Sequence, residues 1–450
     1  VRRDASSKLP SMKNSEWFPA FSASWKLSSE KFFRNSVLGD VFDLVKIRAG
    51  WGKVGNVTLY PRMSTTDIPL EAYPDPSLIG GKDVYGTYSP TIPNTGATWE
   101  TTVQTSAGID FALFKNKLEV SVDYYHKQTR DLVDYVPTPP QMGVTESPMG
   151  NMGQVTNKGW EFSVSYHNSA AQGRFNYNVW GTFSTNKSNV DDYGPQPLVR
   201  HDNPNVNSTA ILYSGVGHPW YSYYLYRTDG IFRSQEEIDR HVYKDSETGQ
   251  TKLVQPNAKV GDLKFIDING DGKISDEDRV LTGCYTPKQT FAFGGSFDWK
   301  GFDFSFMFQG VAGNYIYNGT KQMAMNGRQD FGNLMTDVYN TWDFNPAHSK
   351  YPRLGLAEDN NGNYIRFSDA FLEKGDYLRL KNITLGYTLP KHIARYVGLK
   401  NGSLRVYMSI DNVATITGYS GCDPEVGNYG LDAGVYPTSR FFNFGVNFNF

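Results

Sequence analysis

The sequence predicts an all-β protein in which long antiparallel strands form part of a transmembrane β-barrel. Three observations lead to this prediction. Runs of alternating apolar and polar residues recur along the whole chain, the connections between runs alternate between short and long, and the two faces of a run differ in polarity. A period of two is the pattern of a strand with one apolar face.

About eleven runs of this kind follow one another along the chain. In the first run, Phe21 and Trp25 share one face, while Ser22 and Ser24 share the other. The runs cover residues 18–27, 44–52, 102–114, 117–128, 159–167, 175–186, 290–299, 302–313, 376–389, 403–410 and 441–450. We therefore expect about eleven strands.

Several of the short connections have the composition of tight hairpin turns. Lys115-Asn116 and Lys300-Gly301 each join two runs, and residues 171–174 join another pair. The best helical candidates, residues 234–243 and 329–342, fall in long connections. We expect no amphipathic helix of more than two or three turns.

The long connections are expected at about 54–98, 131–156, 187–285, 314–374 and 411–438. Short turns at one end of the strands and long loops at the other are typical of an outer-membrane β-barrel, with periplasmic turns and extracellular loops. A soluble sandwich has no reason to segregate its loops so regularly, and strands of ten or more residues are long for one.

The last run shows the two faces of a barrel wall. Its apolar face contains Phe442, Phe444, Val446, Phe448 and Phe450, and its polar face contains Asn443, Gly445, Asn447 and Asn449. Such a strand suits a wall with lipid outside and water inside. A sandwich would also tolerate an outer ladder of asparagines, so the alternation of the loops is the stronger observation.

The predicted topology is incomplete by itself. If the long connections lie outside, the chain starts outside and ends in the periplasm with an odd number of strands. Bacterial barrels normally have an even number, and an open sheet edge is not stable in lipid. We therefore expect the other part of the barrel to come from preceding sequence or from another chain.

Composition excludes several classes of function. The net charge is −2 and there is no basic run, so we expect no nucleic acid partner. Two cysteines, Cys284 and Cys422, are too few for a disulfide framework, and we do not expect them to be bonded to each other. No catalytic motif is visible, and His126 and His167 sit near strand ends, where a position in the wall or at the rim is the ordinary explanation. We expect no enzyme.

Residues 265–278, FIDINGDGKISDED, have the spacing of an EF-hand calcium loop without its flanking helices. The ligand positions are Asp267, Asn269, Asp271, Lys273 through its carbonyl, Ser275 and Asp278, with Gly272 at the sharp turn. Hard oxygen donors at alternate positions suit calcium, and the sequence predicts a structural calcium ion here. A surface turn without an ion has the same composition, and Asp278 is shorter than the usual glutamate.

Residues 217–232 concentrate aromatic side chains in a short span. Trp220, Tyr221, Tyr223 and Tyr224 are the candidates for stacking on sugar rings or clamping a peptide. Trp and Tyr are also common at membrane boundaries and in packed loops, and we favour that interpretation.

Several stretches together resemble the SusC/RagA-type TonB-dependent outer-membrane transporters of Bacteroidota. They are residues 17–33, 45–56, 121–133, 151–166, 261–283, 377–390, 422–427 and 436–450, in the order found in that family. The resemblance covers nearly the whole chain and corresponds to the carboxy-terminal part of a 22-stranded barrel. The family's plug domain has no counterpart in this sequence.

The resemblance implies a function in energised import across the bacterial outer membrane, among outer-membrane lipid and lipopolysaccharide. A SusD-like surface lipoprotein would cover the barrel, TonB would act through the missing amino-terminal part, and the substrate would be a glycan or a peptide. The terminal Phe450 resembles the signal that the barrel-insertion machinery reads.

Two other functions remain open from the sequence. A non-transporting surface barrel would be a structural or adhesive component of an envelope complex. An enzyme at the barrel rim would need a His/Asp or Ser/His cluster in one loop region.

Overall fold

The structure is a computed structural model that describes residues 1–57, 77–84, 91–136, 138–142, 147–168, 175–194, 198–206, 209–327, 332–355, 361–396 and 402–449. The chain divides into two compact units. The first comprises Val1–Val164 and Thr185–Leu198, and the second comprises Ser165–Ser184 and Val199–Phe450. No helix among the described residues is long and apolar enough to cross a membrane.

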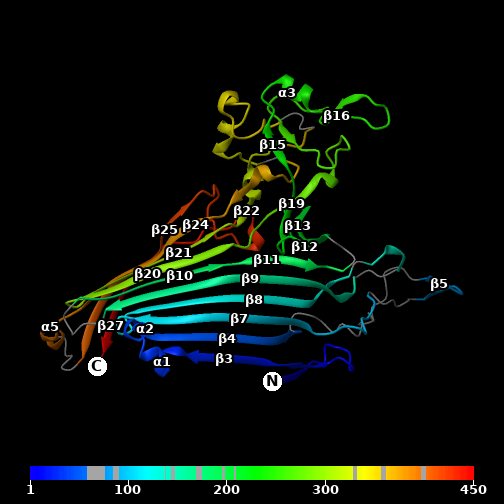
Figure 1. Cartoon of the computed structure of the whole chain (residues 1–450). Helices are drawn as coiled ribbons and strands as arrows, with labels where there is room; N and C mark the ends of the chain where they lie inside the picture. The colour runs from blue at the N-terminus through cyan, green and yellow to red at the C-terminus, as the bar shows by residue number, and fades with distance from the viewer. Residues whose placement is uncertain are drawn as a thin grey trace. The chain divides into compact units, whose positions relative to one another are not determined.

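The first unit is built on long antiparallel strands that lie side by side (Figure 1). Their order is β9-β8-β7-β4-β3, and β11 pairs with the first part of β9. The bounds are β3 Ala20–Lys26, β4 Phe42–Asn56, β7 Glu100–Leu113, β8 Leu118–Tyr135, β9 Met149–Asn168 and β11 Lys187–Asp192. The smaller elements are β1 Arg2–Ala5, β2 Ser15–Phe18, α1 Lys31–Arg34, α2 Val37–Val41, β5 Ser77–Ile79 and β6 Lys82–Val84.

The second unit is also built on antiparallel strands, in the order β27-β25-β24-β21-β20-β10. The bounds are β10 Asn176–Thr185, β20 Gln289–Trp299, β21 Phe302–Ala312, β24 Tyr377–Thr388, β25 Ser403–Thr417 and β27 Phe441–Asn449. The short strands are β12 Leu198–Val206, β13 Thr209–Gly215, β14 Ser222–Tyr226, β15 Thr228–Ile231, β16 Val242–Lys244, β17 Thr251–Leu253, β18 Leu263–Phe265, β19 Arg279–Cys284, β22 Tyr315–Asn318, β23 Leu372–Lys374 and β26 Leu431–Asp432. The helices are α3 Gln235–Arg240, α4 Gly319–Ala324 and α5 Lys391–Tyr396.

The all-β prediction and the number of long strands are confirmed within the described residues, since the two series together contain eleven. The predicted hairpin turns are also confirmed. Lys115 and Asn116 have positive φ angles between β7 and β8, as do Lys300 and Gly301 between β20 and β21. Positive φ at both central residues is the geometry of a tight hairpin turn. The turn expected at 171–174 lies outside the described residues.

Some strands are longer than the sequence predicted. β8 continues to Tyr135 and β9 begins at Met149, although we expected a loop over 131–156. The added part of β9 is held by β11, which pairs Val190 with Val155. β25 likewise extends to Thr417, which pairs with Tyr377 of β24. Backbone pairing therefore continues beyond the point where side-chain alternation fades.

The helix predictions were partly correct. α3 lies within the candidate span 234–243, and the Ser234 hydroxyl caps it by accepting from the backbone N–H of Glu237. The span 329–342 contains, in its described part, only a 3₁₀ turn over Thr336–Asn340. α4 was not predicted, because its sequence has no apolar stripe.

The two faces of β27 differ as the sequence predicted. On the apolar face, Val446 lies opposite Val406 and Phe444 opposite Met408, and all four side chains are exposed. On the other face, the Asn449 amide donates to the Ser403 hydroxyl at 3.2 Å. The strand thus carries an uncovered apolar face and a hydrogen-bonded polar face, which is the pattern of a barrel wall.

The first unit has a charged network on the polar face of its sheet. The Arg48 guanidinium of β4 pairs with Asp110 of β7 at 2.7 Å and with Asp123 of β8 at 2.9 Å. The Ser121 hydroxyl donates to Asp110 at 2.8 Å. These groups link three neighbouring strands by their side chains. Because they are partly exposed, each ion pair adds only about 1 kcal/mol or less to stability.

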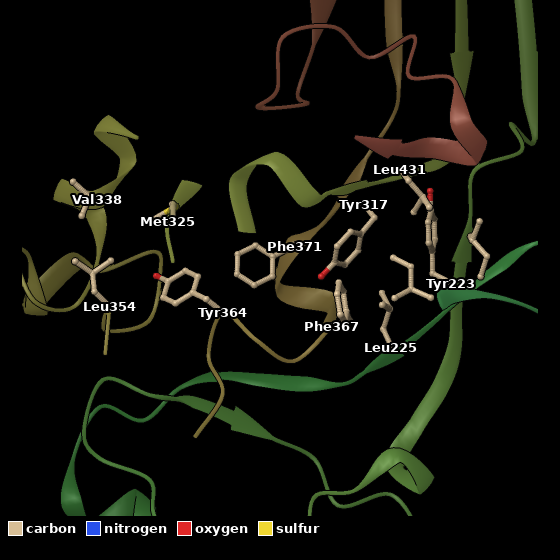
Figure 2. Packing of buried hydrophobic residues seen from close by; sticks show 12 residues of the cluster. Tyr223, Leu225, Tyr317, Met325, Val338, Leu354, Tyr364, Phe367, Phe371 and Leu431 are labelled. Atoms are coloured by element: carbon tan, nitrogen blue, oxygen red, sulfur yellow. The ribbon is translucent and has the colours of Figure 1, made fainter. Parts of the chain in front are cut away.

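The long connections of the second unit fold together around one hydrophobic core, which we call the loop domain (the described residues of 211–285, 314–374 and 418–432). The core residues come from all three connections (Figure 2). They are Ile211, Leu212, Tyr223, Leu225, Tyr317, Met325, Val338, Leu354, Tyr364, Phe367, Phe371 and Leu431. Side chains from the three connections therefore pack against one another in a shared core.

Replacing Val446 with arginine tests the lipid-facing assignment. Val446 is 53% exposed on the apolar face of β27. We expect the variant to be destabilised by about 2–4 kcal/mol near the bilayer midplane and to insert poorly. Asn447→Arg, on the opposite face, is the matched control and should insert normally. Heat-modifiable mobility of the full-length protein from outer membranes measures this, and equal insertion of both variants would contradict the assignment.

Candidate functional site

The predicted calcium loop, Asp267–Asp278, follows β18 in the loop domain and is closed by its own side chains. The Asp267 carboxylate accepts from the backbone N–H of Gly270 at 2.7 Å and of Gly272 at 2.8 Å. Asn269 accepts from the N–H of Asp271 at 3.0 Å, and Asp271 accepts from the N–H of Lys273 at 2.8 Å. The alternate polar residues therefore turn the backbone by accepting its N–H groups.

Asp278 joins the two ends of this loop. It is fully buried, and its Oδ1 accepts from the N–H of Ile268 at 2.9 Å, while its Oδ2 accepts from the N–H of Ser275 at 2.7 Å. Ser275 caps the 3₁₀ turn Asp276–Asp278, so the two residues form a capping box. Asp278, at position twelve of the loop, therefore holds the two ends of the loop together through hydrogen bonds.

The donor chemistry of the loop suits calcium, since all the side-chain donors are hard oxygens. The structure brings Asp267, Asn269, Asp271, Ser275 and Asp278 into one turn. Within the described ranges, however, no group of three or more His, Cys, Asp or Glu side chains is arranged to hold a metal ion. The loop closes through hydrogen bonds alone, and calcium binding stays a prediction.

Gly272 fixes the loop against the hairpin formed by β16 and β17. It has φ +83°, and a Cβ at this position would collide with the ring of Tyr243. Gly270 also has a positive φ, +75°, but a Cβ there would meet no atom within 4 Å. Gly272 is thus needed for both the turn and the close approach, whereas Gly270 is needed only for the turn.

The predicted substrate-binding aromatics do not form one exposed surface. Tyr223 is fully buried in the loop-domain core, and its hydroxyl donates to the carbonyls of Tyr315 and Gly430 at 3.0 Å (Figure 2). It therefore supports packing and presents no surface to a ligand. Burial raises its pKa well above the ordinary tyrosine value.

The other three candidates, Trp220, Tyr221 and Tyr224, are partly buried. Tyr224 packs on Tyr213 with ring centroids 4.5 Å apart, and the Arg279 guanidinium lies 4.6 Å from its ring. Trp220 contacts Tyr221 edge-on. These contacts are packing contacts within the loop domain, and a role of these three residues in substrate binding stays a prediction.

A buried polar network that the sequence analysis missed positions β18 and hence the loop. Asp262 is fully buried, accepts from the Asn363 amide at 2.8 Å and pairs with Arg353 at 2.5 Å. The Asn363 side-chain oxygen accepts in turn from the N–H of Leu263 at 3.0 Å. The partners lie about a hundred positions apart in the chain, so no local pattern could reveal them.

A second anchor attaches the connection after β25 to the sheet. Arg379 of β24 is buried and pairs with Asp423 at 2.5 Å and with Glu425. Burial alone would raise the pKa of Asp423, but the N–H groups of Glu425 and Thr438 and the Arg379 guanidinium lower this pKa to about 2. The carboxylate therefore favours folding at neutral pH, and this contribution is lost only as the pH falls through about 2.

The other residues that the sequence analysis singled out are two cysteines, two histidines and Phe450. Both cysteines are free in this structure, with Cys284 buried and Cys422 exposed. His126 and His167 lie in β8 and β9, as expected for wall residues. Phe450 lies outside the described residues.

Comparison with known proteins identifies the class of the chain. Residues 1–413 match the family model described as TonB dependent receptor-like, beta-barrel. The chain belongs to this family. Its members are outer-membrane receptors and transporters, not enzymes.

Individual relatives agree with this assignment. The chain is 31% identical to TonB-dependent receptor P3 of Formosa agariphila and 26% identical to TonB-dependent receptor SusC of Bacteroides thetaiotaomicron. Both alignments cover all of this chain but 43% and 42% of the relatives, so the chain spans less than half their length.

The solved structure of the RagAB peptide transporter has the same fold, with a TM-score of 0.77 at 22% identity. The match covers 100% of the present chain and 45% of the matched chain in the RagAB structure. The resemblance noted in the sequence is therefore confirmed for the family and the fold.

Replacing Gly272 with alanine tests the packing of the loop. The Cβ should cost about 1–2 kcal/mol for the left-handed backbone and about 1–3 kcal/mol for the collision with Tyr243. Gly270→Ala is the matched control and should show only the backbone cost. Thermal unfolding and limited proteolysis of the full-length protein measure the difference, and equal loss in both variants would show that Gly272 does not pack on Tyr243.

Proposed function

We propose that the protein takes part in TonB-energised import of a nutrient across the outer membrane. Membership of the TonB-dependent receptor family is the observation that carries this proposal. The chain would supply barrel wall, with a polar face toward the lumen and an apolar face toward lipid, together with a folded domain built from the long connections.

The substrate class that we propose is a glycan or an oligopeptide. One relative is named TonB-dependent receptor SusC, and a solved structure with the same fold is that of the RagAB peptide transporter. We also propose that a SusD-like surface lipoprotein associates with the protein. The loop domain supports this partnership, because a fixed tertiary core gives a partner a constant surface, whereas separate flexible loops would lose conformational entropy on binding.

Uptake by cells that produce the full-length protein tests the proposed import. Fluorescent oligopeptides and oligosaccharides are supplied to wild-type cells, to a deletion strain, and to wild-type cells treated with a protonophore. We expect one class to accumulate only in untreated wild-type cells, and a lipoprotein to co-purify. Accumulation that is equal in all three would overturn import and favour the structural surface barrel.

We also propose that the Asp267–Asp278 loop binds calcium as a structural ion. The spacing of its oxygen donors supports this. Because the loop's own hydrogen bonds close it, calcium would add stability to a loop that is already folded. At a concentration a hundred times its dissociation constant, the ion would add about 2.7 kcal/mol.

Calcium titration of the full-length protein, freed of metal with a chelator, tests this second proposal. We expect the unfolding midpoint to rise with calcium, and Asp271→Asn to weaken the effect. Glu247→Gln, an exposed acidic residue outside the loop, should respond like the wild type. A midpoint that is unchanged up to millimolar calcium would exclude the site.

A further inference from the structure

A pocket of about 570 Å³ lies in the loop domain between the β16–β17 hairpin and the Asp267–Asp278 loop. Its volume is in the range of small-molecule sites. Among the lining residues that the structure describes, Lys252, Lys273 and Arg366 are cationic and none is acidic. Charge of one sign in a concave site attracts a ligand of the opposite sign.

Arg366 is held in a fixed orientation at this pocket. Its Nη1 donates to the carbonyl of Ile274 at 3.0 Å, and its guanidinium carbon lies 5.4 Å from the Tyr226 ring and 5.3 Å from the Phe265 ring. The ordinary role of such an arginine is to tie the loop to its surroundings. One hydrogen bond uses only one of its five N–H groups, which leaves donors for a ligand.

Within the described ranges, no carboxylate forms an ion pair with Arg366; Asp276 instead accepts a hydrogen bond from the Tyr226 hydroxyl at 2.8 Å. Among the ion pairs in the part of the chain that the structure describes, none within 4 Å includes Arg366 or Lys273. Lys252 differs, because it pairs with Asp245. A partly buried guanidinium with fixed geometry is the group that proteins use to bind carboxylates in a bidentate manner.

The rest of the pocket wall combines an aromatic side chain with two buried amide side chains whose N–H groups donate within the protein. Gln255 and Asn361 line it and are both buried, with the Gln255 amide donating to the Asn361 side-chain oxygen at 2.6 Å. Tyr243 adds an aromatic side chain beside Gly272. A few fixed polar groups among apolar ones are typical of a ligand site.

We propose that this pocket binds a carboxylate-bearing small ligand through Arg366 and Lys273. The carboxylate would belong to a uronic acid residue of a glycan or to the C-terminus of a short peptide, since the two groups present the same chemistry. The proposal goes beyond import, because binding in the loop domain requires neither translocation nor an energy source.

Calorimetry on the purified full-length protein in detergent, at low ionic strength, tests this proposal. The probes are glucuronate, N-acetylalanine and neutral glucose. We expect at least one carboxylate to bind and glucose not to bind, with affinity falling as salt is added. Binding of glucuronate alone supports the glycan source, and binding of N-acetylalanine alone supports the peptide source. If neither carboxylate binds better than glucose, the proposal is wrong.

Variants locate the binding in this pocket. Arg366→Gln should weaken binding of the carboxylate tenfold or more, and Lys273→Gln should weaken it several-fold. Lys244→Gln, an exposed lysine on the same hairpin but outside the pocket, is the matched control and should bind like the wild type.

The variants also distinguish weaker binding caused by the lost charge from weaker binding caused by unfolding. If Arg366→Gln lowers the unfolding midpoint, its weaker binding could come from unfolding. Binding by the Lys273→Gln variant, in which the changed side chain is exposed, then tests the proposal. Unchanged binding in Lys273→Gln and in a folded Arg366→Gln would overturn the assignment even where the wild type binds. Uptake by cells does not enter this test, so its result is independent of the proposed import.

Discussion

Backbone hydrogen bonding between long antiparallel strands is the constraint on which the rest of this structure depends. Water is absent from the hydrocarbon core of a membrane, so each strand must satisfy its N–H and C=O groups on a neighbouring strand. This requirement explains why the paired segments are long and regular, with β8 spanning Leu118–Tyr135 and β9 spanning Met149–Asn168. With the backbone satisfied, one face of each strand is free to be apolar and the other to be polar.

The loop domain follows a different principle. Its connections leave the sheet and bury apolar side chains against one another, as soluble domains do. Tyr317 of β22, Tyr223 of β14 and Leu431 of β26 come from three separate connections, yet all are fully buried in one core. Fixed loops in turn give the protein a defined surface.

Buried polar groups determine how the Asp267–Asp278 loop is presented. Asp278 closes the loop from inside, and Asp262, Asn363 and Arg353 hold the strand that leads into it. Such groups would be costly to bury without partners, and their hydrogen bonds give the loop a single arrangement. Arg366 joins this arrangement to the pocket, because it contacts the loop carbonyl of Ile274 and also lines the cavity.

The sequence by itself determined the fold class, the approximate positions of the long strands, the tight turns and the family. Each of these depends on local periodicity or on turn residues such as Lys300-Gly301. Such features can be recognised from residues that lie close together in the sequence. Only the tertiary structure decided that Tyr223 is a core residue, that Asp278 clasps its loop, and that Arg366 and Lys273 line one pocket. The roles of Tyr223 and Arg366 depend on residues far apart in the sequence, which the folding of the connections around a shared core brings together. Asp278 acts within its own loop, but which N–H groups it accepts from depends on how that loop folds.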